Sequence, residues 1–170
     1  MAKFLIIASF NIMASIEELL EMAIKSEIEA AENYRRAAEI INIYLLKDKF
    51  HFLEKEETGH RKVLENLFKR KFPQKEIVLP DTSEIPFPEF KVNEEMQLSE
   101  IIEKAMEAEK YASDFYRDME KQMDEDKEKA MARYLSSMEE SHYHLLKSEL
   151  EIVRNFELYD EIHAMMHVGP

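Results

Sequence analysis

Hydrophobic side chains recur along the chain at spacings of three and four residues, the period of a helix with one buried face. In the first such segment the apolar positions are Ile16, Leu19, Leu20, Ala23, Ala30 and Tyr34. The pattern predicts helices over residues 15–41, 48–71 and 94–123, a fourth that starts near residue 124, and a short fifth over residues 157–166. The chain is therefore expected to be all-α.

Residues 72–93 interrupt this pattern and contain Pro73, Pro80, Pro86 and Pro88, which cannot occupy a helix interior. A helix of about 25 residues is about 37 Å long, and about 22 extended residues span that distance easily. The segment is therefore interpreted as a crossover that runs the length of a bundle and joins two helical hairpins.

An internal repeat supports two equivalent hairpins. Shifting the sequence by 82 residues places Glu27 on Glu109 and Tyr34 on Tyr116. The same shift aligns the next helix of each half without insertion or deletion, through Leu53 and Leu135, Glu57 and Glu139, His60 and His142, and Leu64 and Leu146. The predicted architecture is an all-α four-helix bundle made of two repeated hairpins joined by a long crossover, with a short C-terminal helix.

Candidate metal ligands lie at matched positions of this repeat. Each half has a Glu-x-x-His pair, whose members share one helical face with buried leucines, and a glutamate flanked by alanines on the preceding helix. Buried carboxylates without partners are costly, whereas four of them and two imidazoles can surround two divalent cations. One such pair is expected by chance, but two at a single offset predict a two-metal centre of Glu27, Glu57, His60, Glu109, Glu139 and His142.

The segments "AIKSEIEAAENY", "FLEKEETGH", "AMEAEKYASDFY" and "YLSSMEESH" resemble the rubrerythrin-like family of the ferritin-like superfamily. The resemblance implies that Glu27 and Glu109 are ligands, that Glu57 and Glu139 bridge or cap the metals, and that His60 and His142 each bind one. Rubrerythrins proper are similar but have a further carboxylate three positions after the third-helix ligand, where this chain has Ala112.

The resemblance implies a di-iron oxidoreductase that reduces hydrogen peroxide or dioxygen. The carboxylate-rich set suits two iron ions, and manganese or a mixed pair is also compatible. The alternative is a ferritin-like iron-binding protein with a ferroxidase, storage or delivery role. A metal-free bundle that binds partners through its acidic surface is a third hypothesis. Sedimentation size would separate the first two, because iron storage requires a cage.

Composition excludes several other classes. The chain has no cysteine, so it contains no rubredoxin-type iron site, and its electrons would come from an external donor such as a separate rubredoxin. A formal charge of −13 argues against binding nucleic acid or an anionic membrane. No apolar run approaches the roughly 20 residues of a transmembrane helix, so we expect a cytoplasmic protein that does not bind membranes.

The remaining expectations concern the ends of the chain and single residues. We interpret residues 1–14 as a non-targeting extension, residues 15–155 as the bundle and residues 156–170 as a short helix and tail. A homodimer is expected, in which the crossover could exchange hairpins between chains. His163 and His167 are interpreted as residues of a surface helix, not as metal ligands. Gly59 is predicted to mark close helix packing, since an interior glycine costs about 1 kcal/mol relative to alanine.

Two readings stay open for Tyr34 and Tyr116. Each phenol could be an ordinary core residue with a locally bonded hydroxyl. Alternatively, each hydroxyl could hydrogen-bond to a metal ligand and hold it in position.

Overall fold

The computed structural model is a bundle of four α-helices and describes residues 14–80, 92–93 and 95–167. The helices are α1 (Ile16–Ile40), α2 (Tyr44–Lys71), α3 (Leu98–Lys121) and α4 (Asp126–His167). The described residues contain no strand, which confirms the all-α prediction. None of the described helices is long and apolar enough to cross a membrane.

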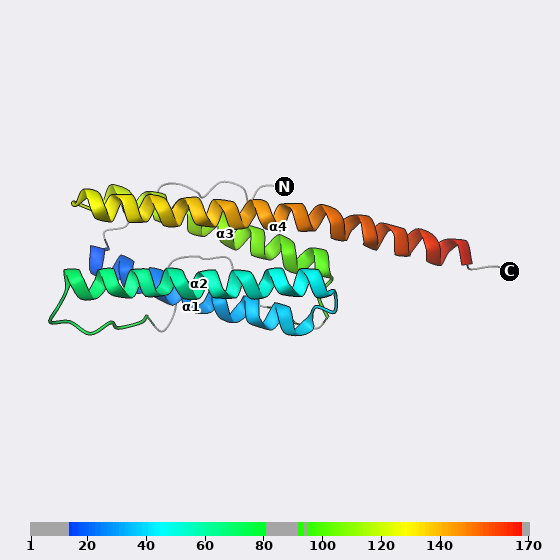
Figure 1. Ribbon diagram of the computed structural model, residues 1–170, viewed down its shortest axis with the longest axis horizontal. Helices are drawn as coiled ribbons and strands as arrows, with labels where there is room; N and C mark the ends of the chain where they lie inside the picture. The colour runs from blue at the N-terminus through cyan, green and yellow to red at the C-terminus, as the bar shows by residue number, and fades with distance from the viewer. Residues whose placement is uncertain (1–13, 81–91, 94, 168–170) are drawn as a thin grey trace.

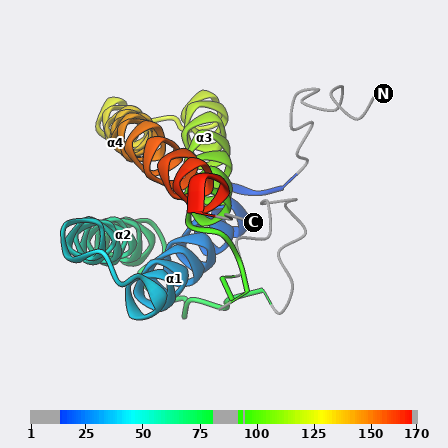
Figure 2. The ribbon, with the colours of Figure 1, turned by 90° about the vertical axis from the view of Figure 1, so that its right-hand side faces the viewer.

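The helices pair as two antiparallel hairpins, α1 with α2 and α3 with α4. In the end-on view the hairpins face each other, with α1 opposite α3 and α2 opposite α4 (Figure 2). α2 ends at one end of the bundle and α3 starts at the other (Figure 1). The link between them therefore joins opposite ends of the bundle, and its described residues form no helix. The predicted hairpin pairs are confirmed, and residues 81–91 of the predicted crossover lie outside the described residues.

The start of α1 agrees with the sequence, whereas the start of α2 differs. Ser15 and Glu18 form a capping box, in which the Ser15 hydroxyl accepts from the Glu18 backbone N–H and the Glu18 carboxylate accepts from the Ser15 N–H. α2 begins at Tyr44, four residues before the predicted start. Tyr44 and Leu45 are exposed apolar residues, so the first turn of α2 does not show the amphipathic period that predicts a helix.

The predicted short C-terminal helix is not a separate element. α4 continues from Asp126 to His167 without a break, and residues 157–166 form its last turns. The physical reason is that no glycine or proline occurs between Asp126 and His167, so nothing in the sequence ends the helix. The predicted extension, apart from Ala14, lies outside the described residues.

The core consists of two apolar clusters at different levels of the bundle. One lies where α1 begins and includes Leu20, Phe68 and Phe115. The other lies where α1 ends and includes Phe50 and Ile102. Between these clusters the interior is polar, and that layer holds the predicted metal ligands.

Candidate metal centre

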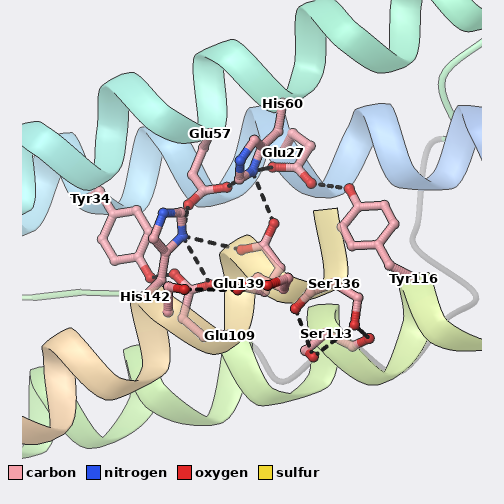
Figure 3. Close-up of polar contacts among 12 residues, drawn as sticks. Glu27, Tyr34, Glu57, His60, Glu109, Ser113, Tyr116, Ser136, Glu139 and His142 are labelled. Carbon is pink, nitrogen blue, oxygen red and sulfur yellow. Dashed lines mark hydrogen bonds and ion pairs between the residues drawn. The ribbon is translucent and has the colours of Figure 1, made fainter. Parts of the chain in front are cut away.

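All six predicted ligands meet in one buried layer, and each helix contributes to it (Figure 3). Every one of them is at most 4% exposed. α1 and α3 each supply one glutamate, and α2 and α4 each supply a glutamate and a histidine three residues later. The predicted ligands that meet there are Glu27, Glu57, His60, Glu109, Glu139 and His142.

The helical period explains why these side chains point inward. Leu53 and Leu64 lie four residues before Glu57 and four residues after His60, and both leucines are completely buried. Leu135 and Leu146 flank the pair on α4 in the same way. The polar residues are therefore part of the buried stripe of each helix, where their burial requires compensation by charge or by hydrogen bonds.

Glu57 and Glu139 each face both histidines. Glu57 Oε2 lies 3.2 Å from Nδ1 of His60, and Glu57 Oε1 lies 3.1 Å from Nδ1 of His142. Glu139 repeats this arrangement, with Oε1 at 2.9 Å from Nδ1 of His60 and Oε2 at 3.3 Å from Nδ1 of His142. Each carboxylate thus spans the two halves of the centre, which is the placement that a bridging ligand requires.

Glu27 and Glu109 each approach one histidine only. Glu27 Oε2 lies 3.7 Å from Nδ1 of His60, and Glu109 Oε2 lies 3.6 Å from Nδ1 of His142. These two carboxylates therefore lie at opposite outer sides of the centre. The six side chains form two overlapping groups of four, which share Glu57 and Glu139 and whose ligand atoms lie within 4.8 Å of one another.

Two buried tyrosines hold the outer carboxylates in a crossed arrangement. The Tyr34 hydroxyl on α1 donates to Oε1 of Glu109 on α3, and the Tyr116 hydroxyl on α3 donates to Oε1 of Glu27 on α1 (Figure 3). Both rings are buried in the apolar clusters. The two readings left open by the sequence therefore both apply, because each tyrosine packs in the core and bonds to a candidate ligand.

Burial and charge divide the carboxyl groups into two kinds. Desolvation raises the pKa of Glu27 well above its usual value, and the charges of Glu139 and Glu57 raise it further. Desolvation together with the same two charges raises the pKa of Glu109. Burial also opposes ionisation of Glu57, but the nearby imidazoles of His142 and His60 outweigh it and lower the pKa of Glu57. Burial and charge thus favour the protonated form of the two outer carboxyls and the ionised form of Glu57.

The imidazoles retain protons as well. Desolvation disfavours the charged form of His142, but the carboxylates of Glu109, Glu139 and Glu57 outweigh it and raise the pKa of His142 to about 12. The pKa of His60 is raised in the same way by Glu139, Glu27 and Glu57. Protons therefore supply the positive charge that four buried carboxylates need in the absence of metal.

Several buried polar atoms of these six side chains lack hydrogen-bond partners within the described part of the chain. Glu57 Oε1, Glu139 Oε1 and His142 Nδ1 are buried, yet none makes a hydrogen bond of acceptable geometry to the described residues. Their neighbours lie close but not in the direction that a hydrogen bond requires. Atoms that converge without pairing are satisfied by a cation between them, so the residues fit a two-metal centre.

The comparisons with known proteins agree with this geometry. The family model described as rubrerythrin matches residues 18–150. The chain belongs to the rubrerythrin family. A solved structure, hypothetical protein Pfu-1136390-001 from Pyrococcus furiosus, is 39% identical, with a TM-score of 0.76 over 84% of this chain and 92% of that one. No curated protein matches the chain. This rubrerythrin-family chain has no cysteine, so it lacks a rubredoxin-type iron site.

The structure corrects one prediction near the centre and adds one residue. A Cβ built on Gly59 would have nothing within 4 Å, so the predicted close helix packing is wrong. Phe52 on α2, which was not predicted, stands edge-on to the His142 ring with centroids 6.4 Å apart. Phe52 is 46% exposed, whereas His142 is 2% exposed, so the phenyl ring lies on the solvent side of this contact. The repeat offers only a weak signal for it, since its equivalent is another aromatic residue, Tyr134.

His163 and His167 lie in the last turns of α4, away from the metal centre. The His163 ring is exposed and stacks on Tyr159, with centroids 6.1 Å apart. The side chain of His167 is outside the described part. His163 thus behaves as the surface residue that was expected.

Proposed function

We propose that this rubrerythrin-family protein is a di-iron oxidoreductase that reduces hydrogen peroxide. The observation that carries the proposal is the placement of Glu57 and Glu139, each of which faces both histidines. Two carboxylates that span two sites hold two metal ions near each other, and such pairs carry out two-electron chemistry.

The ligand roles follow from the same geometry. Glu57 and Glu139 would bridge the two ions, while His60 and Glu27 would complete one site and His142 and Glu109 the other. The Nδ1 atom of each histidine faces the carboxylates and would bind the metal. Four carboxylates balance two divalent ions, so loading the site would replace buried protons without leaving net buried charge.

A carboxylate-rich set with two imidazoles favours iron or manganese over zinc, which prefers fewer ligands in a tetrahedral arrangement. When bound, a reduced iron pair would supply two electrons to hydrogen peroxide, which with two protons gives two molecules of water. The electrons would come from an external donor such as a separate rubredoxin. The tyrosines hold the outer carboxylates, and the apolar clusters on both sides keep bulk water from the centre.

A ferroxidase or iron-delivery role is the second candidate, and one feature favours it. The resemblance to rubrerythrins proper implies a further carboxylate at one position of the third helix, but this chain has Ala112 there. Ala112 packs against an apolar cluster. The proposed centre therefore has six candidate ligands in a symmetrical set. Such a set could bind and oxidise iron without being specialised for peroxide.

The experiment loads the apoprotein with Fe(II) without oxygen, counts iron per chain, and follows the optical change after adding peroxide or air. Two irons with faster oxidation by peroxide support the peroxidase, and faster oxidation by air supports the ferroxidase. Glu139→Gln should lose iron, whereas Glu140→Gln is a matched control because Glu140 is the exposed neighbour on the same helix. Full binding by Glu139→Gln would contradict the proposed centre.

A further inference from the structure

The C-terminal part of α4 extends well beyond the bundle (Figure 1). Lys49 on α2 pairs with Glu149 on α4 at 2.5 Å, and α2 starts only five residues before Lys49, at Tyr44. Because α2 and α4 are antiparallel, α2 reaches no further along α4 than about residue 154. Residues 154–167 are therefore an overhang about 21 Å long, which has no α2 beside it.

α3 ends its contact with α4 at nearly the same level. Arg154 pairs with Glu103 at 2.5 Å, and the Ser99 backbone N–H at the start of α3 donates to Glu157 at 3.2 Å. After Glu157, no described helix lies beside α4. In the end-on view α4 slants across the bundle, and this segment projects toward the reader in front of α3, near the middle of the bundle (Figure 2).

The overhang continues the face of α4 that packs on α2. Within the bundle Glu128, His142 and Glu149 contact α2 and are separated by multiples of seven residues, the heptad period of paired helices. The next heptad position is Phe156, which is 62% exposed. Together with Ile152 (50%) and Tyr159 (64%), it forms an apolar stripe at spacings of four and three. An established interface thus continues beyond the point where its partner helix stops.

The beginning of α2 is also uncovered. Ile43, Tyr44 and Leu45 are 46%, 73% and 72% exposed and lie at the same end of the bundle as the overhang. α2 has no side-chain cap and no acidic residue in its first turn, so its terminal N–H groups face this end without a protein partner among the described side chains.

We propose that the overhang binds the same segment of a second copy of the chain, with the two overhangs antiparallel and the stripe that contains Phe156 and Tyr159 facing the partner. The partner's overhang would then lie where α2 would lie if it continued. The partner's overhang would run in the direction of α2 and is as long as the uncovered part of α4. Its C-terminal end would therefore reach the uncapped start of α2. The contact is isologous, because each overhang fills the gap of the other.

Charge favours this arrangement over side-by-side contact of two bundles. Each chain carries −13, so two bundles in close contact would repel. Paired overhangs place the bundles at opposite ends of the shared segment, separated by most of its length. The proposal uses no property of the metal centre and stands or falls independently of the proposed function.

The test is sedimentation of the full-length protein, with and without metal, and of single variants. The wild type should sediment as a dimer, twice the chain mass of 20.2 kDa. Phe156→Glu should halve that mass, while helix content and iron binding stay unchanged because residue 156 is exposed. Leu158→Glu is the matched control, since Leu158 is 54% exposed on another side of the same turn, and it should remain dimeric.

A cross-link gives a second, positional test, because the chain has no cysteine of its own. Tyr159 lies near the middle of the overhang, so Tyr159→Cys should form an interchain disulfide under mild oxidation, and Leu158→Cys should not. A monomeric wild type would overturn the proposal. A dimer that survives Phe156→Glu and does not cross-link through residue 159 would also overturn it and would point to exchange of hairpins.

Discussion

The crossed tyrosines lead to a prediction about metal affinity. The two oxygens of Glu109 have different partners: Oε1 accepts from Tyr34, and Oε2 points toward His142 at 3.6 Å. The phenol therefore fixes which oxygen faces the proposed metal. Tyr34→Phe removes only this hydroxyl and keeps the ring, which packs edge-on against Phe50 with centroids 5.8 Å apart.

The expected cost can be worked out from this single bond. Groups that orient metal ligands typically change metal affinity 10- to 100-fold, which is about 1.4–2.7 kcal/mol. Tyr34→Phe should weaken binding by that factor at the site formed with Glu109, while the site formed with Glu27 keeps its own tyrosine. Tyr34→Phe combined with Tyr116→Phe should weaken both sites by similar factors.

The assay is a competition titration of Mn(II) or Fe(II) against a chelator, without oxygen, analysed for two sites. Tyr143→Phe is the control, because Tyr143 lies next to His142 in sequence but is partly exposed and pairs with His144 outside the centre. Equal affinities in Tyr34→Phe and wild type, with native helix content in both, would refute the orienting role. A loss of the same size in Tyr143→Phe would show that the effect is not specific.

Three further results are expected. Gly59→Ala should raise the free energy of unfolding by about 0.5–1 kcal/mol in urea denaturation, because its Cβ meets open space; a loss would refute this. Lys71→Val should lower the free energy of unfolding by about 3 kcal/mol, because it leaves the buried Glu128 unpaired. Adding Glu128→Leu should restore it, because both positions then carry the residues of their repeat equivalents, Val153 and Leu46. In thermal melts the apoprotein should lose stability as pH rises from about 5 to 8. The reason is that folding raises the pKa of the two imidazoles and of the two outer carboxyls, so the stability that their bound protons provide falls with rising pH. The metal-loaded protein should gain stability over that range, because metal displaces these protons; parallel trends would contradict the assignment.

The sequence was sufficient for the architecture and for the residues that meet in the centre. Helical period and the repeat predict four helices and two hairpins, and two Glu-x-x-His pairs on buried faces must converge once the hairpins pack. These inferences succeed because they depend on local spacing. The ligand roles of the six residues stay a prediction, as do the metal, the electron donor and the location in the cell.

The wrong predictions concern Gly59 and the end of α4, where the outcome depends on whether another helix lies nearby. Gly59 is interpreted as a packing glycine because its cost in a helix needs a reason, yet nothing lies near it. The sequence predicts a separate helix at the end of α4 because the apolar residues there do not continue the buried pattern. These apolar residues are exposed. α4 continues past the neighbouring helices, and no described helix of this chain covers its last turns.

The repeat also shows how the two hairpins recognise each other. At the metal centre the halves are equivalent, but between α2 and α4 they are complementary. Lys71 and Glu128 form an ion pair where the repeat has Val153 and Leu46, and Lys49 and Glu149 form one where it has Met131 and Leu67.

This asymmetry decides which hairpins can pair. Two copies of the first hairpin would place Lys71 against Leu46 and Lys49 against Leu67, leaving four lysines without carboxylate partners. The first hairpin therefore fits the second and not itself, because each unpaired charge would lose its partner at a partly desolvated interface. Any dimer, including one that exchanges hairpins, must still pair a first hairpin with a second one, so every complete centre has one Glu-x-x-His pair from each half.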